Sequence, residues 1–417
     1  MSIEGWEKTK ISQLGEIVTG STPDTQNSDY WGGDIPFVSP SDFNSSAFIL
    51  KTDKTLTRQG AKQARNISKD SILVTCIGSI GGIAIAPWEC VTNQQINSVI
   101  CREKFDAFFV YFLIKNNLFK LQKLAGTTTL PIINKSTFGN IEIVCPKSKK
   151  EQEKIAEVLS TIDRAIAQTE AIIAKQQRIK TGLMQDLLTK GIDENGNIRS
   201  EATHKFKDSA IGRIPVEWKV VATGEVTNSL VPGRDKPDLD GGGIPWITIP
   251  DIDAMYICAS KNGFSLSQKA IKLANARLMP RGTVLMSCVG EFGITTITEV
   301  EVIANQQLHG FICGDDILPE WLAIQINASG TRIDTLTTQT TIKYLNKTGC
   351  ESILIALPNI DEQKRAISIF GNSLRFIATQ EKHLAKLQHQ KTGLMQGLLT
   401  GKVRVTNLLK EREPTSP

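Results

Sequence analysis

The stretch that decides the fold is KTGLMQDLLTKG (residues 180–191), because it returns almost unchanged as KTGLMQGLLTGK (391–402). A phrase repeated at about half the chain length indicates an internal duplication. Other pieces recur in the same order, since IPFVSPSDF (35–43) is answered by IPWITIPDI (244–252). We therefore expect two copies of one unit, each a globular domain followed by a long helix.

Two segments carry apolar residues at alternating spacings of four and three, and each opens on a Glu-Gln pair shortly after a proline. This heptad pattern is typical of coiled-coil helices. A helix of about 40 residues is roughly 60 Å long, which is more than one face of a small domain can cover. We therefore expect the two helices to pair with each other, and antiparallel pairing would place the domains at opposite ends. Gly182 and Gly393 indicate bends or close helix approach, because glycine is costly inside a helix.

The fold class that follows is α/β mixed (α+β). Two similar domains, each a twisted sheet with small helices, are joined by two long antiparallel helices in a pseudo-twofold internal repeat. The expected boundaries are a first domain at residues 1–148, a spacer helix at 149–190, a linker at 191–217, a second domain at 218–358, a second spacer helix at 359–405 and a flexible tail at 406–417.

The net charge of +5, from 48 basic and 43 acidic residues, is too small to indicate a polyanionic partner. The second domain is net acidic. We expect a cytoplasmic protein, because the chain has neither a membrane-spanning apolar run nor a signal sequence. Its eight cysteines lie singly, without a CxxC motif, which favours small buried residues over disulfides or a zinc site.

The Glu-Gln helix after a proline, the KTGLMQ phrase, the linker GIDENGNIRSEATHKFKDSAIGRIPVEW (191–218) and the duplication together resemble the specificity subunit of type I restriction-modification enzymes. The resemblance covers nearly the whole chain. It implies two target recognition domains, each reading one half of a split, asymmetric DNA site, with the helices as a ruler that fixes the gap. Two readers on one face of B-DNA must lie about a helical turn, roughly 34 Å, or a multiple apart.

The resemblance also implies the partners of the chain. They are double-stranded DNA, two methyltransferase subunits with S-adenosylmethionine, and two restriction (motor-nuclease) subunits with ATP and Mg, in a bacterium or archaeon. No cofactor and no membrane is expected for this chain itself. The shared helix faces would dock identical subunits twice, since a pseudo-twofold pair requires the same surface twice, although the helices could repeat only because they pack on each other. The docking candidates are Lys180, Gln185, Lys391 and Gln396.

A search for catalytic motifs finds none. The chain has no Asn-Pro-Pro-aromatic or Asp-Pro-Pro-aromatic adenine pocket, no glycine motif for S-adenosylmethionine and no phosphate loop. The sequence EWK (217–219) has the carboxylate and lysine of a nuclease core but lacks its upstream Pro-Asp. We therefore predict a non-catalytic recognition subunit without a metal site.

Three groups of residues are candidates for DNA contact. Basic residues at spacings of three or four predict a basic face on one helix in each domain, although a solvated face explains them as well. They are Lys54, Arg58, Lys62, Arg65 and Lys69 in the first domain and Lys269, Lys272, Arg277 and Arg281 in the second. Threonine runs could meet phosphates or base edges, or reflect strand propensity: Thr127, Thr128 and Thr129, with Thr337, Thr338, Thr340 and Thr341. Divergent loops, which could distinguish two half-sites, contribute Thr22, Gln26, Asn27 and Tyr30 in one domain and Arg234 and Lys236 in the other.

The triplet Asn-Gln-Gln occurs at 93–95 and again at 305–307. Its amides could read adenine. Because the triplet is identical in domains expected to read different sequences, a structural hydrogen-bonding role is favoured.

Two other functions stay open on the sequence alone. One is a single-chain enzyme with a duplicated core, which would need reactive residues paired across the halves. The other is a coiled-coil scaffold without sequence-specific DNA reading, which would show only salt-dependent background binding.

Overall fold

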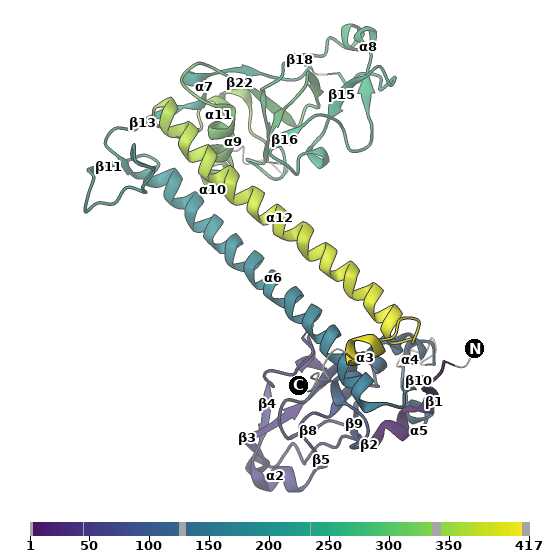
Figure 1. Cartoon of the computed structure of the whole chain (residues 1–417). Coiled ribbons are helices and arrows are strands. Elements are labelled where there is room, and N and C mark those ends of the chain that lie inside the picture. The colour runs from purple at the N-terminus through teal and green to yellow at the C-terminus, as the bar shows by residue number, and fades with distance from the viewer. Residues whose placement is uncertain (1–2, 45, 125–130, 234, 336–342, 411–417) are drawn as a thin grey trace, which may run out of the picture. The chain divides into compact units, whose positions relative to one another are not determined.

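A computed structural model describes residues 3–44, 46–124, 131–233, 235–335 and 343–410. The chain divides into two compact units (Figure 1). Unit 1 comprises Met1–Ile172 with Gln380–Pro417, and unit 2 comprises Ile173–Thr379. Each unit holds one globular domain together with parts of two long helices, α6 (Lys149–Thr189) and α12 (Ile360–Leu398).

The first domain belongs to unit 1. Its elements are β1 (Trp6–Lys10), α1 (Ile11–Leu14), β2 (Gly15–Thr19), η1 (Ser28–Tyr30), β3 (Trp31–Val38), η2 (Pro40–Asp42), β4 (Lys54–Leu56), α2 (Arg58–Lys62), β5 (Asn66–Ile67), β6 (Ile72–Thr75), β7 (Ile83–Ile85), β8 (Cys90–Thr92), β9 (Ile96–Cys101), α3 (Ala107–Asn116), α4 (Leu118–Leu124), α5 (Lys135–Gly139) and β10 (Glu142–Pro146). Its strands form the orders β2-β9-β6-β7 and β4-β3-β8-β5, and β1 pairs with β10.

The linker and second domain belong to unit 2. Their elements are β11 (Phe206–Ser209), β12 (Gly212–Pro215), β13 (Lys219–Ala222), α7 (Thr223–Val226), β14 (Thr227–Leu230), β15 (Ile244–Ile247), η3 (Ile249–Asp251), β16 (Tyr256–Ile257), β17 (Ser265–Leu266), α8 (Gln268–Leu273), β18 (Leu278–Met279), β19 (Val284–Ser287), β20 (Thr295–Thr298), β21 (Val302–Ala304), β22 (Leu308–Cys313), α9 (Pro319–Ala328), α10 (Gly330–Asp334), α11 (Lys347–Glu351) and β23 (Leu354–Leu357). The strand orders are β14-β22-β19-β20-β16 and β17-β15-β21-β18, with β13 against β23 and β11 against β12.

The two domains share one topology. The order β2-β9-β6-β7 is answered by β14-β22-β19-β20, and the order β4-β3-β8-β5 by β17-β15-β21-β18. The predicted duplication is therefore confirmed. The prediction of a single twisted sheet in each domain is wrong, because the short strands separate into several sheets with apolar residues packed between them.

A largely buried helix packs against the strands of each domain. Helix α3 buries Phe109, Phe112 and Leu113, and helix α9 buries Trp321 and Leu322. A helix that is apolar on all sides must be covered on all sides. Contacts of α3 with β6 and β7, and of α9 with β19, β20 and β23, provide this cover.

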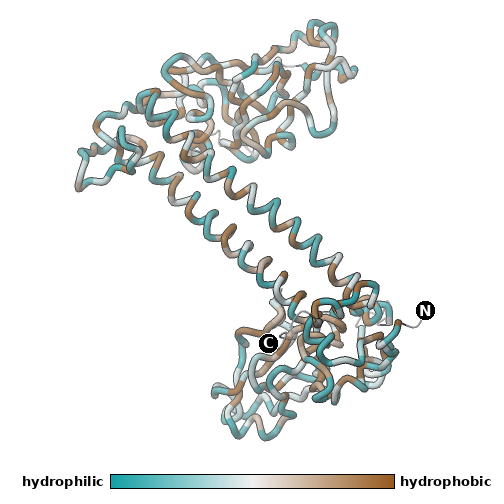
Figure 2. Tube along the Cα trace, viewed as in Figure 1, coloured by the Kyte–Doolittle hydropathy of each residue, from teal (hydrophilic) through white to brown (hydrophobic). Residues whose placement is uncertain are grey.

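The long helices run antiparallel within each unit. In unit 1, Ile155 and Leu159 near the start of α6 pack in one core with Leu398 at the end of α12. In unit 2, Leu187 near the end of α6 packs with Phe370 near the start of α12. Figure 2 shows apolar and polar residues alternating along both helices, so the predicted apolar stripes are confirmed.

The glycines of the repeated phrase do not serve a close approach within the described residues. A Cβ atom added at Gly182 or Gly393 would meet no atom within 4 Å. Both positions lie in uninterrupted helix and are exposed. The expected close helix approach at these positions is therefore wrong.

Glu362, the first residue of the second Glu-Gln pair, is a buried junction in unit 2. It is 1% exposed and accepts hydrogen bonds from both terminal nitrogens of Arg199. The indole Nε1 of Trp218 donates to its Oε2 at 3.1 Å, and the backbone N–H of Ile192 donates to its Oε1 at 3.0 Å. Burial by itself would lower the pKa of Arg199, but the hydrogen bond and charge of Glu362 raise it above the usual value.

Unit 1 contains the same junction. Glu151 accepts hydrogen bonds from Nε of Arg404 at 2.7 Å and from Nη2 of the same residue at 3.1 Å. The indole Nε1 of Trp6 donates to the same carboxylate at 3.4 Å. In each unit, therefore, the segment that follows one long helix is tied to the first turn of the other. We call these two groups the Glu–Arg–Trp junctions.

The glutamine of each pair attaches the helix to its domain. Gln152 donates to the carbonyl of Pro146 at 3.0 Å and accepts from the backbone N–H of Asp106 at 3.0 Å. Gln363 donates to the carbonyl of Pro358 at 2.9 Å and accepts from the N–H of Leu318 at 2.9 Å. The Glu-Gln pair thus fixes where each long helix begins.

The C-terminal part differs from expectation. Helix α12 ends at Leu398, seven residues before the predicted end at 405, because Gly401 turns the chain with a φ of 71°. A short helix, α13 (Thr406–Lys410), follows where a frayed tail was expected. Val405 before it is buried in the core of unit 1, which holds α13 in place.

The eight cysteines are free thiols. Five of them are buried, as predicted, but Cys258 is exposed and Cys101 and Cys313 are half-buried. Among the described residues, no helix is long and apolar enough to span a membrane. The same residues contain no group of three or more His, Cys, Asp or Glu side chains placed to hold a metal ion.

Candidate nucleic-acid interface

In the first domain the divergent loop, residues 20–30, is held at several points. The hydroxyl of Thr22 donates to Oε1 of Gln94 at 2.6 Å. Further along, the indole Nε1 of Trp31 donates to the carbonyl of Asp24 at 3.1 Å. Oδ1 of Asn27 accepts from the N–H of Asp29 at 3.0 Å and so caps η1. The loop therefore has a defined shape that presents the exposed side chain of Gln26.

Helix α2 packs directly against this loop. Thr57 caps α2 by accepting from the N–H of Gly60 at 3.1 Å, while its own N–H donates to the carbonyl of Tyr30 at 3.0 Å. Its hydroxyl also donates to the carbonyl of Asp29 at 2.7 Å. A Cβ atom at Gly60 would lie 2.2 Å from the carbonyl oxygen of Tyr30, so only glycine allows this contact.

The basic residues of the first domain do not share one helix, which corrects the sequence expectation. Lys54 lies in β4, and only Arg58 and Lys62 lie on α2. Arg65 and Lys69 lie on either side of β5. The physical reason is that Thr57 starts the helix after β4 and that the chain leaves it at Lys62 to form the β5 ladder with β8.

Four of these basic residues nevertheless lie beside the divergent loop: Lys54, Arg58, Lys62 and Arg65. Nη1 of Arg65 donates to the carbonyl of Thr19 at 2.8 Å, at the start of the loop. The ammonium of Lys54 lies over the ring of Trp31, 5.7 Å from its centroid, in a cation–π contact. Arg58 and Lys62 are exposed on α2 beside η1. The structure thus brings amides, an aromatic ring and positive charges to one face. We call it the first polar face, and its residues are Gln26, Asn27, Trp31, Lys54, Arg58, Lys62 and Arg65.

The second domain has an equivalent second polar face, formed by residues 229–233, 235–243 and 265–281. Nε2 of Gln306 donates to the carbonyl of Gly233 at 3.1 Å. Asp240 accepts from the N–H of Ser267 at 2.7 Å, and hydrogen bonds from Ser267 lower the pKa of Asp240. Ser267 in turn caps α8, where Thr57 caps α2 in the first domain. Loop and helix are therefore joined in the same way in both domains.

The candidates of the second domain also lie on more than one element. Lys269 and Lys272 are on α8, whereas Arg277 and Arg281 follow it in the turns on either side of β18. One helix carrying all four is therefore wrong, because α8 ends at Leu273 and Asn275 turns the chain with a φ of 47°. Lys236, Lys269, Lys272 and Arg277 are exposed. Lys272 and Lys62 occupy equivalent positions, five residues after the capping residue.

Several predicted contacts lie outside the described residues. These are Thr127, Thr128 and Thr129, Arg234, and Thr337, Thr338, Thr340 and Thr341. They stay predictions.

The docking candidates differ in how far the packing of the helices leaves them accessible. Nζ of Lys391 lies 2.5 Å from Oδ1 of Asp163 in unit 1, so this lysine is engaged within the molecule. Lys180 is half-buried, whereas Gln185 and Gln396 are exposed. The repeated phrase therefore has an inner face of leucine and methionine and an outer face of threonine, glycine and glutamine.

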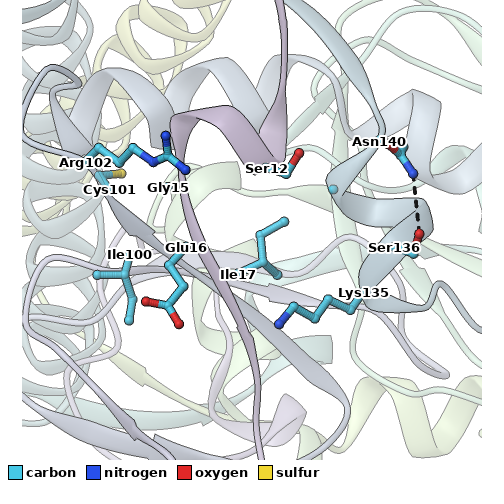
Figure 3. Close-up of a pocket in the computed structure, with 11 residues that line it drawn as sticks. Ser12, Gly15, Glu16, Ile17, Ile100, Cys101, Arg102, Lys135, Ser136 and Asn140 are labelled. Atoms are coloured by element: carbon cyan, nitrogen blue, oxygen red, sulfur yellow. Dashed lines mark hydrogen bonds between the residues drawn. The ribbon is translucent and has the colours of Figure 1, made fainter.

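The first domain also has an open cavity of about 910 Å³ on a different part of its surface. Figure 3 shows Glu16, Arg102 and Lys135 around it, with Nδ2 of Asn140 donating to Oγ of Ser136 at 3.4 Å. The cavity is at the start of β2, whereas the first polar face follows the end of that strand. Burial, with the charge of Asp106, raises the pKa of the Cys101 thiol at its edge to about 12, so this thiol stays protonated.

Sequence reasoning favoured a structural hydrogen-bonding role for the Asn-Gln-Gln triplets. Their middle glutamines have such a role, since Gln94 and Gln306 form hydrogen bonds with the divergent segments. Arg199 and Arg404 were missed because they follow the two repeated phrases at different distances, eight residues after Gly191 and three after Gly401.

Comparison with known proteins adds the family. A family model described as the type I restriction modification DNA specificity domain matches residues 3–177 and again residues 215–389. The chain is 26% identical to the type I restriction enzyme MjaIX specificity subunit of Methanocaldococcus jannaschii, over 97% of this chain and 94% of that one. It is 37% identical to the HindI specificity subunit of Haemophilus influenzae over 35% of this chain and 33% of that one.

The fold matches as well. The crystal structure of the S subunit of a type-I restriction-modification system from M. genitalium aligns with a TM-score of 0.59 and 16% identity, over 95% of this chain and 96% of that one. The family model occurs twice and accounts for most of the chain, in the same two places as the structural repeat. The chain therefore belongs to the type I restriction-modification DNA specificity family.

Proposed function

We propose that this chain is the sequence reader of a type I restriction-modification complex, with residues 1–148 and 218–358 as two target recognition domains. Each reads one half of a bipartite, asymmetric DNA site, and the two long helices, α6 (Lys149–Thr189) and α12 (Ile360–Leu398), set the gap between the halves. One observation carries the proposal: the two polar faces have the same framework but different exposed side chains.

The chemistry of the two polar faces suits two kinds of DNA contact, one to phosphates and one to bases. Lys62 and Lys272 recur at equivalent exposed positions, which suits contacts to phosphates that are the same in every sequence. Side chains on the divergent segments differ, which suits base reading. Amides such as those of Gln26 and Asn27 pair with adenine, and lysines such as Lys236 pair with guanine.

The second domain is net acidic, so its DNA contact must be local. Counterions are released where individual Lys or Arg side chains meet phosphates, whatever the total charge of the domain. Lys236, Lys269, Lys272 and Arg277 provide such a local group of exposed cations on the second polar face.

Chemistry on the DNA then belongs to partner subunits. We place two methyltransferase subunits on the outer face of the repeated phrase, centred on Gly182 and Gln185 in unit 2 and on Gly393 and Gln396 in unit 1. A glycine inside a helix costs roughly 1 kcal/mol relative to alanine, and among the residues that the structure describes no neighbour requires either one. S-adenosylmethionine is assigned to these partners, and ATP and Mg to two restriction subunits.

The test is to co-express the chain with its methyltransferase subunit in a host without DNA methylation and to map N6-methyladenine across the genome. A single split motif with two unlike halves is the expected result. Binding of S-adenosylmethionine by an intact complex that methylates no defined motif would instead indicate a scaffold without sequence reading and would overturn the proposal. Methylation by this chain alone would indicate a single-chain enzyme.

A further inference from the structure

The repeated Asn-Gln-Gln triplets form self-contained turns between buried strands. In the turn between β8 and β9, Nδ2 of Asn93 donates to Oε1 of Gln95 at 2.9 Å, and Oδ1 of Asn93 accepts from the N–H of Gln95 at 3.1 Å. The turn between β21 and β22 repeats both bonds between Asn305 and Gln307, at 3.2 Å each. The outer two residues thus stabilise the turn, and the middle glutamine extends to the surface.

The middle glutamine contacts the divergent segment in both domains. Oε1 of Gln94 accepts from the hydroxyl of Thr22, 72 positions earlier, at 2.6 Å. Nε2 of Gln306 donates to the carbonyl of Gly233, 73 positions earlier, at 3.1 Å. The same framework position therefore reaches the same part of each divergent segment, although the segments differ in sequence.

The two hydrogen bonds run in opposite directions. Gln94 accepts, whereas Gln306 donates to a backbone carbonyl. A primary amide has both an acceptor oxygen and donor hydrogens, so one residue type can hold two unlike loops. This explains how an identical triplet is compatible with two different reading surfaces.

In the first domain the hydrogen bond between Thr22 and Gln94 lies where the strand framework ends and the divergent loop begins. Just after β2, the backbone N–H of Gly20 donates to the carbonyl of Ile96 in β9, and the N–H of Ser21 donates to the carbonyl of Thr92 in β8. The bond of Thr22 to Gln94 comes next along the chain, and Gln26, Asn27 and Tyr30 follow it. A change at Gln94 therefore moves the loop relative to a rigid support.

We propose that Gln94 and Gln306 are positioning residues for sequence reading, each fixing the divergent segment of its own domain at its own half-site. This inference rests on the proposed function. It predicts that each glutamine affects recognition of one half-site and leaves the other unchanged, so each half-site serves as the internal control for the other.

The experiment uses the complex with its methyltransferase subunits. Methylation rates are compared on duplexes with the cognate site and with single base changes in either half. Gln94→Met keeps the side-chain length but removes the amide, and discrimination at the first half-site should fall about fivefold, the effect of roughly one hydrogen bond. Gln306→Met should do the same at the second half-site only.

Conservative variants separate positioning from direct base contact. Gln94→Glu keeps an acceptor for Thr22, so it should retain discrimination. Thr22→Ser keeps the donor and should also retain it, whereas Thr22→Val should lose as much as Gln94→Met. The double variant Thr22→Val with Gln94→Met should be no worse than either single variant, because both remove the same bond.

The outcomes are distinguishable. Equal loss at both half-sites, or no loss at either, would overturn the positioning role while leaving the split motif of the wild-type complex intact. Loss of discrimination in Gln94→Glu, with additive losses in the double variant, would show that Gln94 reads a base itself and would also overturn the inference. If the wild-type complex methylates no split motif, the proposed function fails first.

Discussion

Glu362 at the start of α12 forms a two-point hydrogen-bonded ion pair with Arg199, which lies 163 positions earlier in the linker after α6. Both side chains are buried, and Trp218 completes the contacts of the carboxylate. The equivalent pair in unit 1 joins Glu151 to Arg404. In each unit the residue that follows one long helix therefore fixes the beginning of the other.

Removing Arg199 should destabilise unit 2 strongly. Arg199→Ala leaves the carboxylate of Glu362 buried without its charge partner, and we expect a loss of about 3 kcal/mol or more in the free energy of unfolding. Urea unfolding followed by tryptophan fluorescence measures it. Arg213→Ala is the matched control, since it removes an exposed pair with Glu201 and should cost far less stability. Equal losses in the two variants would contradict a stabilising junction.

Replacing the glycines of the repeated phrase by alanine should raise the stability of the chain while weakening its binding to methyltransferase subunits. Gly182→Ala and Gly393→Ala should each stabilise the isolated chain by about 0.5 to 1 kcal/mol, because alanine favours the helix. Each should also weaken binding of one methyltransferase subunit, measured by titration calorimetry, because the added methyl occupies the docking face.

The control for these variants is Gly371→Ala. Gly371 also lies on α12 with no atom within 4 Å of an added Cβ, but it is outside the repeated phrase. It should stabilise the chain to a similar extent and leave assembly unchanged. Unaltered assembly of all three variants would place the partner elsewhere.

Shortening the helices should change the gap between half-sites and nothing else. We would delete one heptad from each, residues 170–176 and 378–384, so that the apolar stripes stay in register. Mapping N6-methyladenine should then show a shorter gap between two unchanged half-sites. A changed half-site sequence with the original gap would rule out the ruler.

Removing a lysine from a polar face should weaken DNA binding uniformly. Lys62→Ala or Lys272→Ala should reduce the slope of log affinity against log salt by about 0.9, as expected for one lost phosphate contact. The slope is measured by binding of the methyltransferase complex at several salt concentrations. Lys8→Ala, which removes an exposed lysine of β1, should leave it unchanged. A reduced slope in all three variants would point to a general charge effect.

Asp251 should make the second domain sensitive to acid. Burial by itself would raise the pKa of Asp251, but hydrogen bonds from Thr248, Lys261 and Ser260 outweigh it and lower the pKa. A carboxylate with a lowered native pKa stabilises the fold above its unfolded pKa of about 4, and this stabilisation is lost as the pH falls through the native pKa.

The corresponding measurement compares the wild-type chain with Asp251→Asn. The free energy of unfolding of the variant should be lower at pH 7 and should depend less on pH below about 4. An acid dependence as steep as that of the wild type would assign the effect to other carboxylates.

The duplication, the helix pair and the position of the Glu-Gln pairs could be predicted because they rest on periodic or repeated sequence. Ile155, Leu159 and Phe370 lie in a stripe whose burial follows from spacing alone. Helix α2 could not be placed in this way. Its start depends on Thr57 and its packing on the contact of Gly60 with Tyr30. Neither feature produces a periodic pattern in the sequence.

The candidate site was predicted in part for the same reason. Comparing the two halves identified the divergent segments, and the structure brings them beside the basic residues. The comparison could not identify Gln94 and Gln306 as their supports, because an identical residue carries no sign of the bond it makes. It could not identify Arg199 and Arg404 as junction residues either, since their partners lie in another part of the chain.

The two stretches of chain that form unit 1 are translated at different times, and this affects how its domain folds during synthesis. Unit 2 is one continuous stretch, Ile173–Thr379, whereas unit 1 needs Gln380–Pro417 as well as Met1–Ile172. As the chain leaves the ribosome, the domain that is made first lacks Leu398, Val405 and Arg404 until all of unit 2 has been synthesised. During that time the apolar residues that pack against Leu398 and the carboxylate of Glu151 lack their partners. A segment translated after unit 2 thus completes the first domain, and termination before that segment would leave the domain with exposed apolar surface for chaperones and proteases to recognise.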